Sequence, residues 1–284
     1  MTHAKNHHVT RCATCGTVLH GPFCSACGEK VLNEHDLTLR HFLEHLFEAF
    51  THADGKIFKT LRALVTQPGQ LVAEYLAGRR KPYLAPLAVF LAVNTLFFLV
   101  MPRLGWNTVT TPFEVQMHRV LFSPVVRSVV AHRLAATGED QTAYAARFDH
   151  LTGPLAHSCV LLLVPLFSLP VWVLFRRQQR QYVGHLVFSL YFCAFWLLFM
   201  LGSLGLTNTL LFYGGFRPSA QTLDNAITLA GAAVMAVYLF QATRRVYPGP
   251  LWLRAIQAAA LVVSLRLVLD GYRLLLFFAT YLLT

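Results

Sequence analysis

The sequence predicts an all-α polytopic membrane protein, with about five transmembrane helices and a small N-terminal zinc ribbon. Of its 284 residues, 55% are hydrophobic and only 13% are charged, and the mean hydropathy is +0.49. These values differ from those of a soluble domain. Two Cys-x-x-Cys-Gly motifs precede the first long apolar run. The chain therefore divides into a cysteine-bearing part and a membrane part.

The division falls at residues 78–86, which read Gly-Arg-Arg-Lys-Pro-Tyr-Leu-Ala-Pro and are named the hinge below. Arg79, Arg80 and Lys81 are followed by an aromatic residue and then by an uncharged run that begins at Leu87. A helix that enters a bilayer from the cytoplasmic side has this pattern, because its cations stay among the lipid headgroups.

Ahead of the hinge, the spacing of Cys12, Cys15, Cys24 and Cys27 predicts one structural zinc ion in a ribbon over residues 1–35. Each pair lets two thiolates converge on a tetrahedral ion, and residues 16–23 between them suit a short hairpin. A redox dithiol and two disulfides are the alternatives, which the matched glycines disfavour. A site closed by four cysteines has no open position for a substrate, and reduced thiolates indicate the cytosol.

Residues 36–82 are predicted to form an amphipathic helical segment at the cytoplasmic membrane surface. Apolar side chains recur on one helical face over 36–50 and again over 56–66, where Pro68 and Gly69 end the second helix. A third short helix over 70–77 stops at Gly78. One possibility is that these apolar faces pack over the ribbon. The other is that they lie on the membrane surface or against the bundle, and this is favoured because so small a ribbon offers little surface to cover them.

Residues 83–284 are predicted to form the bundle, whose spans are about 83–101, 154–175, 182–206, 222–240 and 252–282. Three basic clusters alternate with these spans: Arg79, Arg80 and Lys81; Arg176, Arg177 and Arg180; Arg244 and Arg245. Because successive loops lie on alternate sides of the membrane, all three clusters fall on the same side as the ribbon. The positive-inside rule then predicts a cytoplasmic N-terminus and a periplasmic or extracellular C-terminus.

The long loop over 102–153 would lie outside, and it has structure of its own. A stripe of apolar side chains from Val125 to Leu134 predicts a helix that lies on the surface. Residues 140–150 predict another helix, which leads back into the membrane.

Several segments resemble a group of bacterial inner-membrane proteins that is known only as a domain of unknown function. The likeness includes both cysteine motifs and most of the later chain, and it is carried by the stretches 61–64, 67–69, 75–86, 164–169, 182–190 and 244–247. The resemblance implies zinc, an inner-membrane location and the topology above. It implies no mechanism.

The formal net charge of +11 could indicate nucleic acid as a partner. However, much of this charge lies beside apolar runs, where cations set topology and contact anionic lipid headgroups. We therefore expect membrane lipids as partners and disfavour nucleic acid. The sequence shows no catalytic triad spacing, phosphate-binding loop or dinucleotide motif, so it favours a protein that is not an enzyme.

A few polar residues lie within the predicted spans. Asn94 is interpreted as an interhelical hydrogen-bonding residue, and His185 is the polar residue to test first. Arg266, Asp270 and Arg273 share one helical face, so the aspartate can bridge both arginines. This triad is either an ion-paired clip that fixes bundle packing or, because it carries a net positive charge, an anionic-ligand site.

Two functions remain open on the sequence. One is a non-enzymatic membrane adaptor or scaffold whose ribbon meets a cytosolic protein partner. The alternative is a small transporter or a lipid- or anion-handling protein that uses the polar residues of the bundle, although no inverted repeat supports transport. A lipid-modifying enzyme ranks third, because paired catalytic carboxylates are missing from the sequence.

Overall fold

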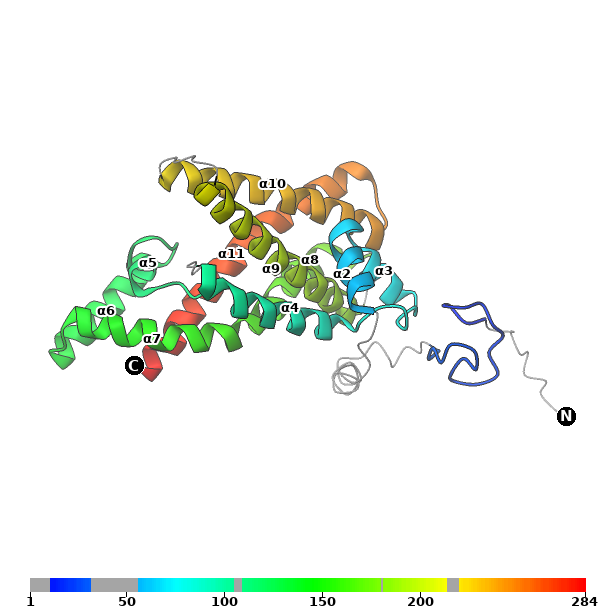
Figure 1. The fold of residues 1–284 in the computed structure, drawn as a ribbon, viewed down its shortest axis with the longest axis horizontal. Helices are drawn as coiled ribbons and strands as arrows, with labels where there is room; N and C mark the ends of the chain where they lie inside the picture. The colour runs from blue at the N-terminus through cyan, green and yellow to red at the C-terminus, as the bar shows by residue number, and fades with distance from the viewer. Residues whose placement is uncertain (1–10, 32–55, 105–108, 180, 214–219) are drawn as a thin grey trace.

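The computed structural model describes residues 11–31, 56–104, 109–179, 181–213 and 220–284 (Figure 1). In these ranges all regular elements are helices, and the cysteine-bearing segment adds two isolated β-bridges. The predicted all-helical class is therefore confirmed for the described part. The predicted helix over 36–50 lies outside the described residues, as do Arg180 and most of the segment before Cys12.

The two short helices before the hinge are α2 (Lys56–Thr66) and α3 (Gln70–Leu76), at the positions that their apolar periodicity predicts. Leu64 of α2 and Leu71 of α3 are buried in the main core. The Tyr238 hydroxyl donates a hydrogen bond to the Leu64 carbonyl at 3.0 Å. Both helices contact the bundle directly, α2 through α9 and α3 through α9 and α10.

The bundle is organised around one long central helix, α9 (Tyr182–Tyr213). It packs against α4 (Pro86–Val100) and α8 (Leu163–Phe175), while α11 (Leu251–Leu283) packs against α8 and α10 (Ala220–Val246) (Figure 1). Aromatic side chains fill the centre. The rings of Phe167 and Phe192, for example, stack with their centroids 4.7 Å apart.

The helix predicted over 140–150 and the predicted second span form one continuous helical run, because α7 (Gln141–Cys159) continues through the 3-10 turn η4 (Val160–Leu162) into α8. The Asp140 carboxylate caps α7 by accepting the backbone N–H groups of Thr142 and Ala143. This N-cap fixes the start of the helix 14 residues ahead of Pro154, and the proline lies inside the helix rather than at its beginning.

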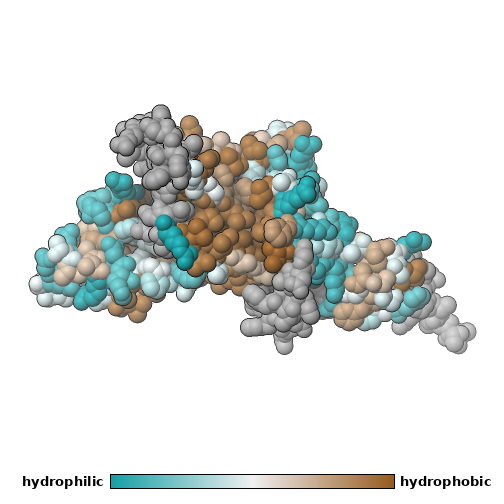
Figure 2. Space-filling view, viewed as in Figure 1, coloured by the Kyte–Doolittle hydropathy of each residue, from teal (hydrophilic) through white to brown (hydrophobic). Residues whose placement is uncertain are grey.

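In the described part, three helical segments are long and apolar enough to cross a membrane: Gln141–Phe175, Tyr182–Thr207 and Ala226–Val246. The predicted first span forms the shorter apolar helix α4, of 15 residues, which continues into the 3-10 turn η3 (Met101–Leu104). The predicted last span forms α11, whose sequence is interrupted by charges. Figure 2 shows an apolar band across the middle of one face, with hydrophilic surface at both ends. These features are those of a membrane protein, and the count of five spans stays a prediction.

The bundle has two distinct ends. At one end, which we call the ribbon end, the Tyr191 hydroxyl donates to the Leu84 carbonyl of the hinge at 3.0 Å. There the ring of Phe175, the last residue of α8, stacks on Tyr247 beyond α10, with centroids 4.1 Å apart.

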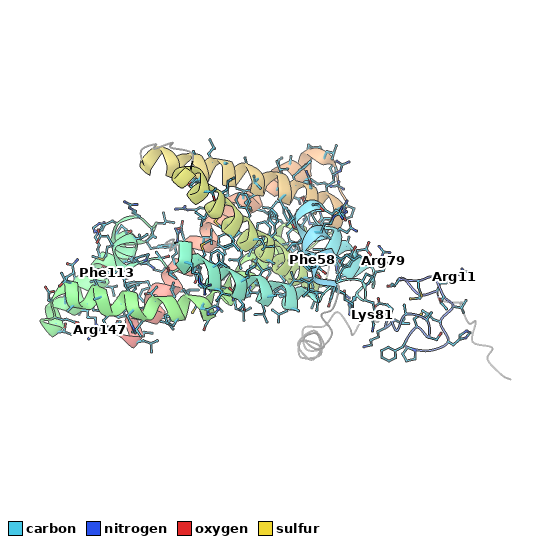
Figure 3. The ribbon with its side chains drawn as sticks, in the orientation of Figure 1. Arg11, Phe58, Arg79, Lys81, Phe113 and Arg147 are labelled. Carbon is cyan, nitrogen blue, oxygen red and sulfur yellow. The ribbon has the colours of Figure 1, made fainter. Side chains whose placement is uncertain are left out.

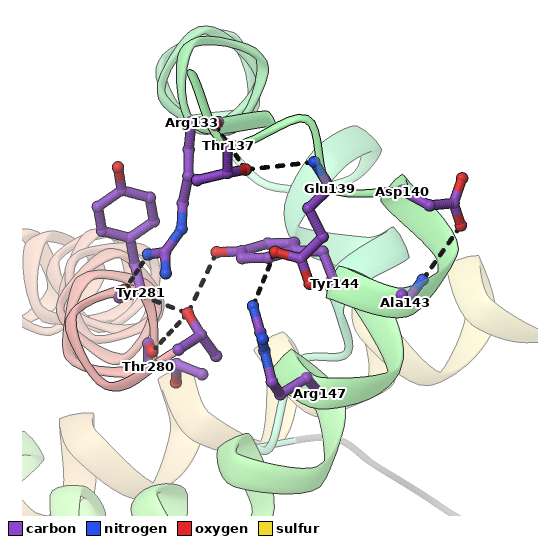
Figure 4. A network of polar contacts seen from close by, with 10 residues as sticks. Arg133, Thr137, Glu139, Asp140, Ala143, Tyr144, Arg147, Thr280 and Tyr281 are labelled. Carbon is purple, nitrogen blue, oxygen red and sulfur yellow. Dashed lines mark hydrogen bonds and ion pairs between the residues drawn. The ribbon is translucent and has the colours of Figure 1, made fainter. Parts of the chain in front are cut away.

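At the other end, the far end, α5 (Phe113–His118) and α6 (Ser123–Thr137) pack with the start of α7 and the last turns of α11 (Figures 1 and 4). The Arg133 guanidinium donates to the Tyr281 carbonyl at 2.7 Å, and Arg147 pairs with Glu139 at 2.8 Å. The helix predicted from the valine stripe is α6, and its buried face, Val126 and Val130, belongs to this second core cluster.

Candidate functional site

The four cysteine sulfur atoms converge on one point. All four lie within 4.8 Å of one another, and the Sγ atoms of Cys12 and Cys27, like those of Cys15 and Cys24, are 3.5 Å apart. Four sulfurs placed tetrahedrally at the usual Zn–S distance would be separated by about 3.8 Å. The donor set and its spacing therefore fit a zinc ion, which would be closed off from substrates by its four thiolates.

Each cysteine pair is held by the same local turn. The backbone N–H of Cys12 donates to the Thr17 carbonyl at 2.8 Å, and that of Cys24 donates to the Glu29 carbonyl at 2.8 Å. Gly16 and Gly28 follow the second cysteine of each pair with φ of 77° and 69°, which other residues adopt only with strain. The β-bridges Arg11–Val18 and Phe23–Lys30 enclose one pair each. The single hairpin expected over 16–23 is thus replaced by two turns, because each cysteine pair lies in a turn of its own that one of these β-bridges closes.

The surroundings of Cys15 favour the thiolate. Hydrogen bonding with the Thr17 hydroxyl, 3.3 Å from the sulfur, and then with the Thr17 backbone lowers the pKa of Cys15 to about 6. A thiolate at neutral pH is the form that binds zinc.

The contact between the ribbon and the hinge runs through Glu29, which was not among the residues predicted to be functional. Its Oε2 atom accepts hydrogen bonds from the Thr14 hydroxyl at 2.8 Å and from the backbone N–H groups of Arg80 at 3.2 Å and Lys81 at 2.9 Å. The residue is only 5% exposed. The carboxylate therefore joins the first cysteine turn, the second cysteine turn and the hinge. The one signal in the sequence is the acid that directly follows the second Cys-x-x-Cys-Gly motif.

The described residues of the basic clusters lie at the ribbon end, where Figure 3 labels Arg79 and Lys81, and the helix ends that carry the other two clusters meet through the stacked rings of Phe175 and Tyr247. Arg79 forms an ion pair with Glu74, and the Arg80 guanidinium lies over the Tyr75 ring, 4.2 Å from its centroid. Arg244 is exposed, and the neighbouring Arg245 donates to the Pro68 carbonyl at 3.4 Å. Arg176 lies over the ring of Trp172, and Arg177 is exposed beside it.

The charged triad in α11 is assembled around Asp270, which is 3% exposed. Arg266 donates to its Oδ2 at 2.9 Å and Arg273 to its Oδ1 at 3.3 Å. The two arginines differ in environment, since the side chain of Arg266 is 61% exposed and that of Arg273 is 24% exposed. The carbonyl of Arg273 also accepts the Gln116 side-chain amide at 3.1 Å, which attaches α5 to α11.

Both nitrogen atoms of His185 are occupied by partners in the protein. Nδ1 lies 3.0 Å from the Tyr247 hydroxyl, Nε2 lies 3.0 Å from the Gln179 carbonyl, and the side chain is fully buried. The ring therefore connects the α8–α9 turn to the turn after α10, and no nitrogen lone pair or N–H remains for a ligand.

Asn94 is also buried, but its Oδ1 atom has no hydrogen-bond partner in the described part of the chain. The interhelical hydrogen bond expected for this residue is thus not made through the carbonyl oxygen. The physical reason lies in its neighbour, since α4 packs against α9, which is built mainly from aliphatic and aromatic side chains.

Comparison with known proteins gives one similarity. Neither the curated proteins nor the solved structures contain a match to the chain. Residues 54–98, which include α2, α3, the hinge and most of α4, are similar to a family described as "Protein of unknown function (DUF3667)".

Proposed function

We propose that the chain is a non-enzymatic adaptor of the bacterial inner membrane, in which a zinc-bearing ribbon on the cytoplasmic side meets a protein partner and the bundle fixes its location. The carrying observation is that, among the described residues, one side of the ribbon is anchored and another bears an exposed aromatic ring. Buried Glu29 attaches it to the hinge, whereas Phe23 is 60% exposed. Exposed aromatic side chains on a rigid support are frequent anchors of protein interfaces.

The distribution of charge supports the proposed orientation. In the described stretches 11–31, 56–86, 176–179, 181–185 and 244–254, at the ribbon end, thirteen Lys and Arg side chains oppose two acidic ones. In the described residues of 101–150, at the far end, five Arg side chains oppose four acidic ones. By the positive-inside rule this difference favours a cytoplasmic ribbon end and, with five crossings, a C-terminus outside.

A photocrosslinking amino acid in place of Phe23, in the full chain in its native membrane, tests the adaptor function. The expected product is a discrete crosslink to one protein, which disappears when Cys24→Ser removes a zinc ligand. The same crosslinker in place of Phe58, an exposed residue of α2 away from the ribbon, is the matched control and should not give that product. A crosslink only to lipid, or none at all from Phe23, would contradict the adaptor function.

A second candidate, the handling of an anion or an anionic lipid, has one specific observation in its favour. Arg266 is largely exposed in the middle of α11, although it is paired with Asp270, and the triad keeps a net positive charge. Native mass spectrometry of the detergent-purified protein distinguishes the candidates. A retained anionic lipid that is lost in Arg266→Gln supports this one, whereas a co-purified protein supports the adaptor.

A further inference from the structure

A cavity of about 520 Å³ opens between α4 and α7, towards the far end. Its wall combines the last turns of α4, the segment before α5 and the middle of α7, and its lining is Thr95, Phe98, Leu99, Thr110, Pro112, Asp149, Thr152, Gly153, Pro154 and His157. The volume is typical of a small-molecule site. None of the residues discussed above as functional candidates lines this cavity.

Asp149 gives the cavity a negative charge. Its Oδ1 accepts the backbone N–H of Phe113 at 2.7 Å, which fixes the orientation of the carboxylate. Among the described residues, no cationic side chain pairs with it, since the nearby Arg147 is engaged by Glu139. Asp149 is exposed, and a carboxylate held in place beside a cavity without a counterion attracts a cationic ligand by its charge.

One further oxygen atom at the cavity lacks a partner. The Thr110 hydroxyl oxygen, on a residue that lines the cavity, is buried and has no hydrogen-bond partner in the described part of the chain. A buried polar atom without a partner is unfavourable, and a ligand with several N–H donors would satisfy it together with Asp149. A primary ammonium group has three such donors.

The rest of the wall suits a lipid. The His157 ring lies on Phe98, with centroids 4.5 Å apart, and the exposed His157 and Thr95 can donate to a phosphate beside the ammonium group. Next to the cavity, Leu96 and Leu99 of α4 and Leu161 of η4 are exposed apolar side chains along which acyl chains can lie. The cavity is also at the depth of a headgroup, because α7 turns into the apolar run of α8 just beyond it.

We propose that this cavity binds a membrane phospholipid whose headgroup ends in a primary ammonium group. The ammonium group lies against Asp149 and Thr110, and the phosphate lies towards His157 and Thr95. This inference depends on the membrane location of the bundle but not on a partner for the ribbon.

The test compares two lipids of the same charge whose headgroup amines differ in their N–H donors and in size. The full chain is stripped of lipid in detergent, and binding of phosphatidylethanolamine and of phosphatidylcholine with the same acyl chains is measured by native mass spectrometry. Phosphatidylcholine has the same charges but no N–H donors. The natural chain should bind phosphatidylethanolamine at least about tenfold more tightly, the usual effect of losing hydrogen bonds to a charged group. Equal binding of both lipids would overturn the proposal.

Two variants locate the site. Asp149→Asn keeps an oxygen for the Phe113 N–H and should abolish the preference, and Thr110→Val should reduce it. Glu114→Gln is the matched control: it removes one negative charge from exposed α5, outside the cavity lining, and should leave the preference unchanged. A preference that survives both cavity variants would refute the assignment. Displacement of the lipid by an equal concentration of soluble ethanolamine phosphate would refute a lipid ligand.

Discussion

Two buried carboxylates, Glu29 and Asp270, each collect hydrogen-bond donors from more than one residue, with different consequences for the molecule. Glu29 gathers three donors on one oxygen atom and so connects the ribbon to the hinge. Asp270 uses both oxygens within a single helix, between one exposed and one half-buried arginine. Removing the first should therefore separate two parts of the chain, and removing the second should weaken one helix and its neighbours.

Glu29→Ala should release the hinge without emptying the metal site. The amide groups of Arg80 and Lys81 lose their acceptor, and a hydrogen bond to a charged group is worth about 1.5–3 kcal/mol, so their hydrogen exchange should accelerate about tenfold or more. Exchange mass spectrometry on peptides covering residues 79–82, with zinc content measured in parallel, checks this. Glu29→Gln retains an acceptor oxygen and should show a smaller effect. Unchanged exchange in the alanine variant would mean that the contact does not protect the hinge in solution.

Asp270→Asn should lower the free energy of unfolding by about 2–3 kcal/mol, because half-buried Arg273 loses its ionic partner. Arg266→Gln removes the exposed member of the same triad and should cost less than about 1 kcal/mol. Thermal unfolding of both variants in detergent makes the comparison. If the two variants lose equal stability, the burial of Asp270 is not what makes the cluster stabilising.

At the scale of single residues, the sequence predicted those groups whose members lie close together in the chain. The four cysteines and the triad follow from separations of a few residues and from helical periodicity. Glu29 and the hinge are 51 residues apart, and nothing in a single sequence relates them. Asp149 and Thr110 line one cavity for the same reason, since Asp149 lies in α7 and Thr110 in the segment before α5, which meet only through the packing of α5 on α7.

At the scale of elements, helix periodicity predicted α2, α3, α6 and the long helices, because each has a sustained apolar pattern. The helix predicted over 140–150 is the start of α7, and its N-cap is Asp140. The prediction separated this helix from the span at 154–175, whereas α7 passes through Pro154 and continues into α8. Hydropathy detects where hydrocarbon begins, which is a different position from where a helix begins.

The turn between α2 and α3 is the closest approach of the short helices to the bundle. Gly69 has φ of 77°, and a Cβ atom there would lie 2.6 Å from the Ala242 carbonyl oxygen of α10. Gly69→Ala should therefore both strain the backbone and push α3 off α10, with a loss of about 2–4 kcal/mol.

Gly138, at the end of α6, separates the two effects. It has a similar φ of 68° but nothing within 4 Å of the added Cβ atom. Gly138→Ala should cost only the backbone strain, about 1–2 kcal/mol. Thermal unfolding in detergent measures both variants, and an equal loss in the two would mean that the contact with Ala242 does not limit packing.

At the scale of the whole molecule, the proposed topology has the ribbon inside and α6 outside. A reporter that is active only outside the cytoplasm should be active when fused after Gly138 and inactive when fused after Arg177. The physical reason is the excess of cations at the ribbon end, which resist transfer across the membrane. The opposite pattern, or activity at both positions, would contradict five crossings in this orientation.

The bond between Glu29 and the hinge also bears on how the protein is made. Glu29 precedes Arg80 by 51 residues, so the ribbon is synthesised before the hinge and before the apolar helix α4 that follows it. If the four cysteines hold a metal ion in the cell, a ribbon folded around that ion can receive the hinge as it emerges. In a cell short of zinc, the hinge would reach the insertion machinery without this partner. The supply of the metal would then decide in which state the chain enters the bilayer.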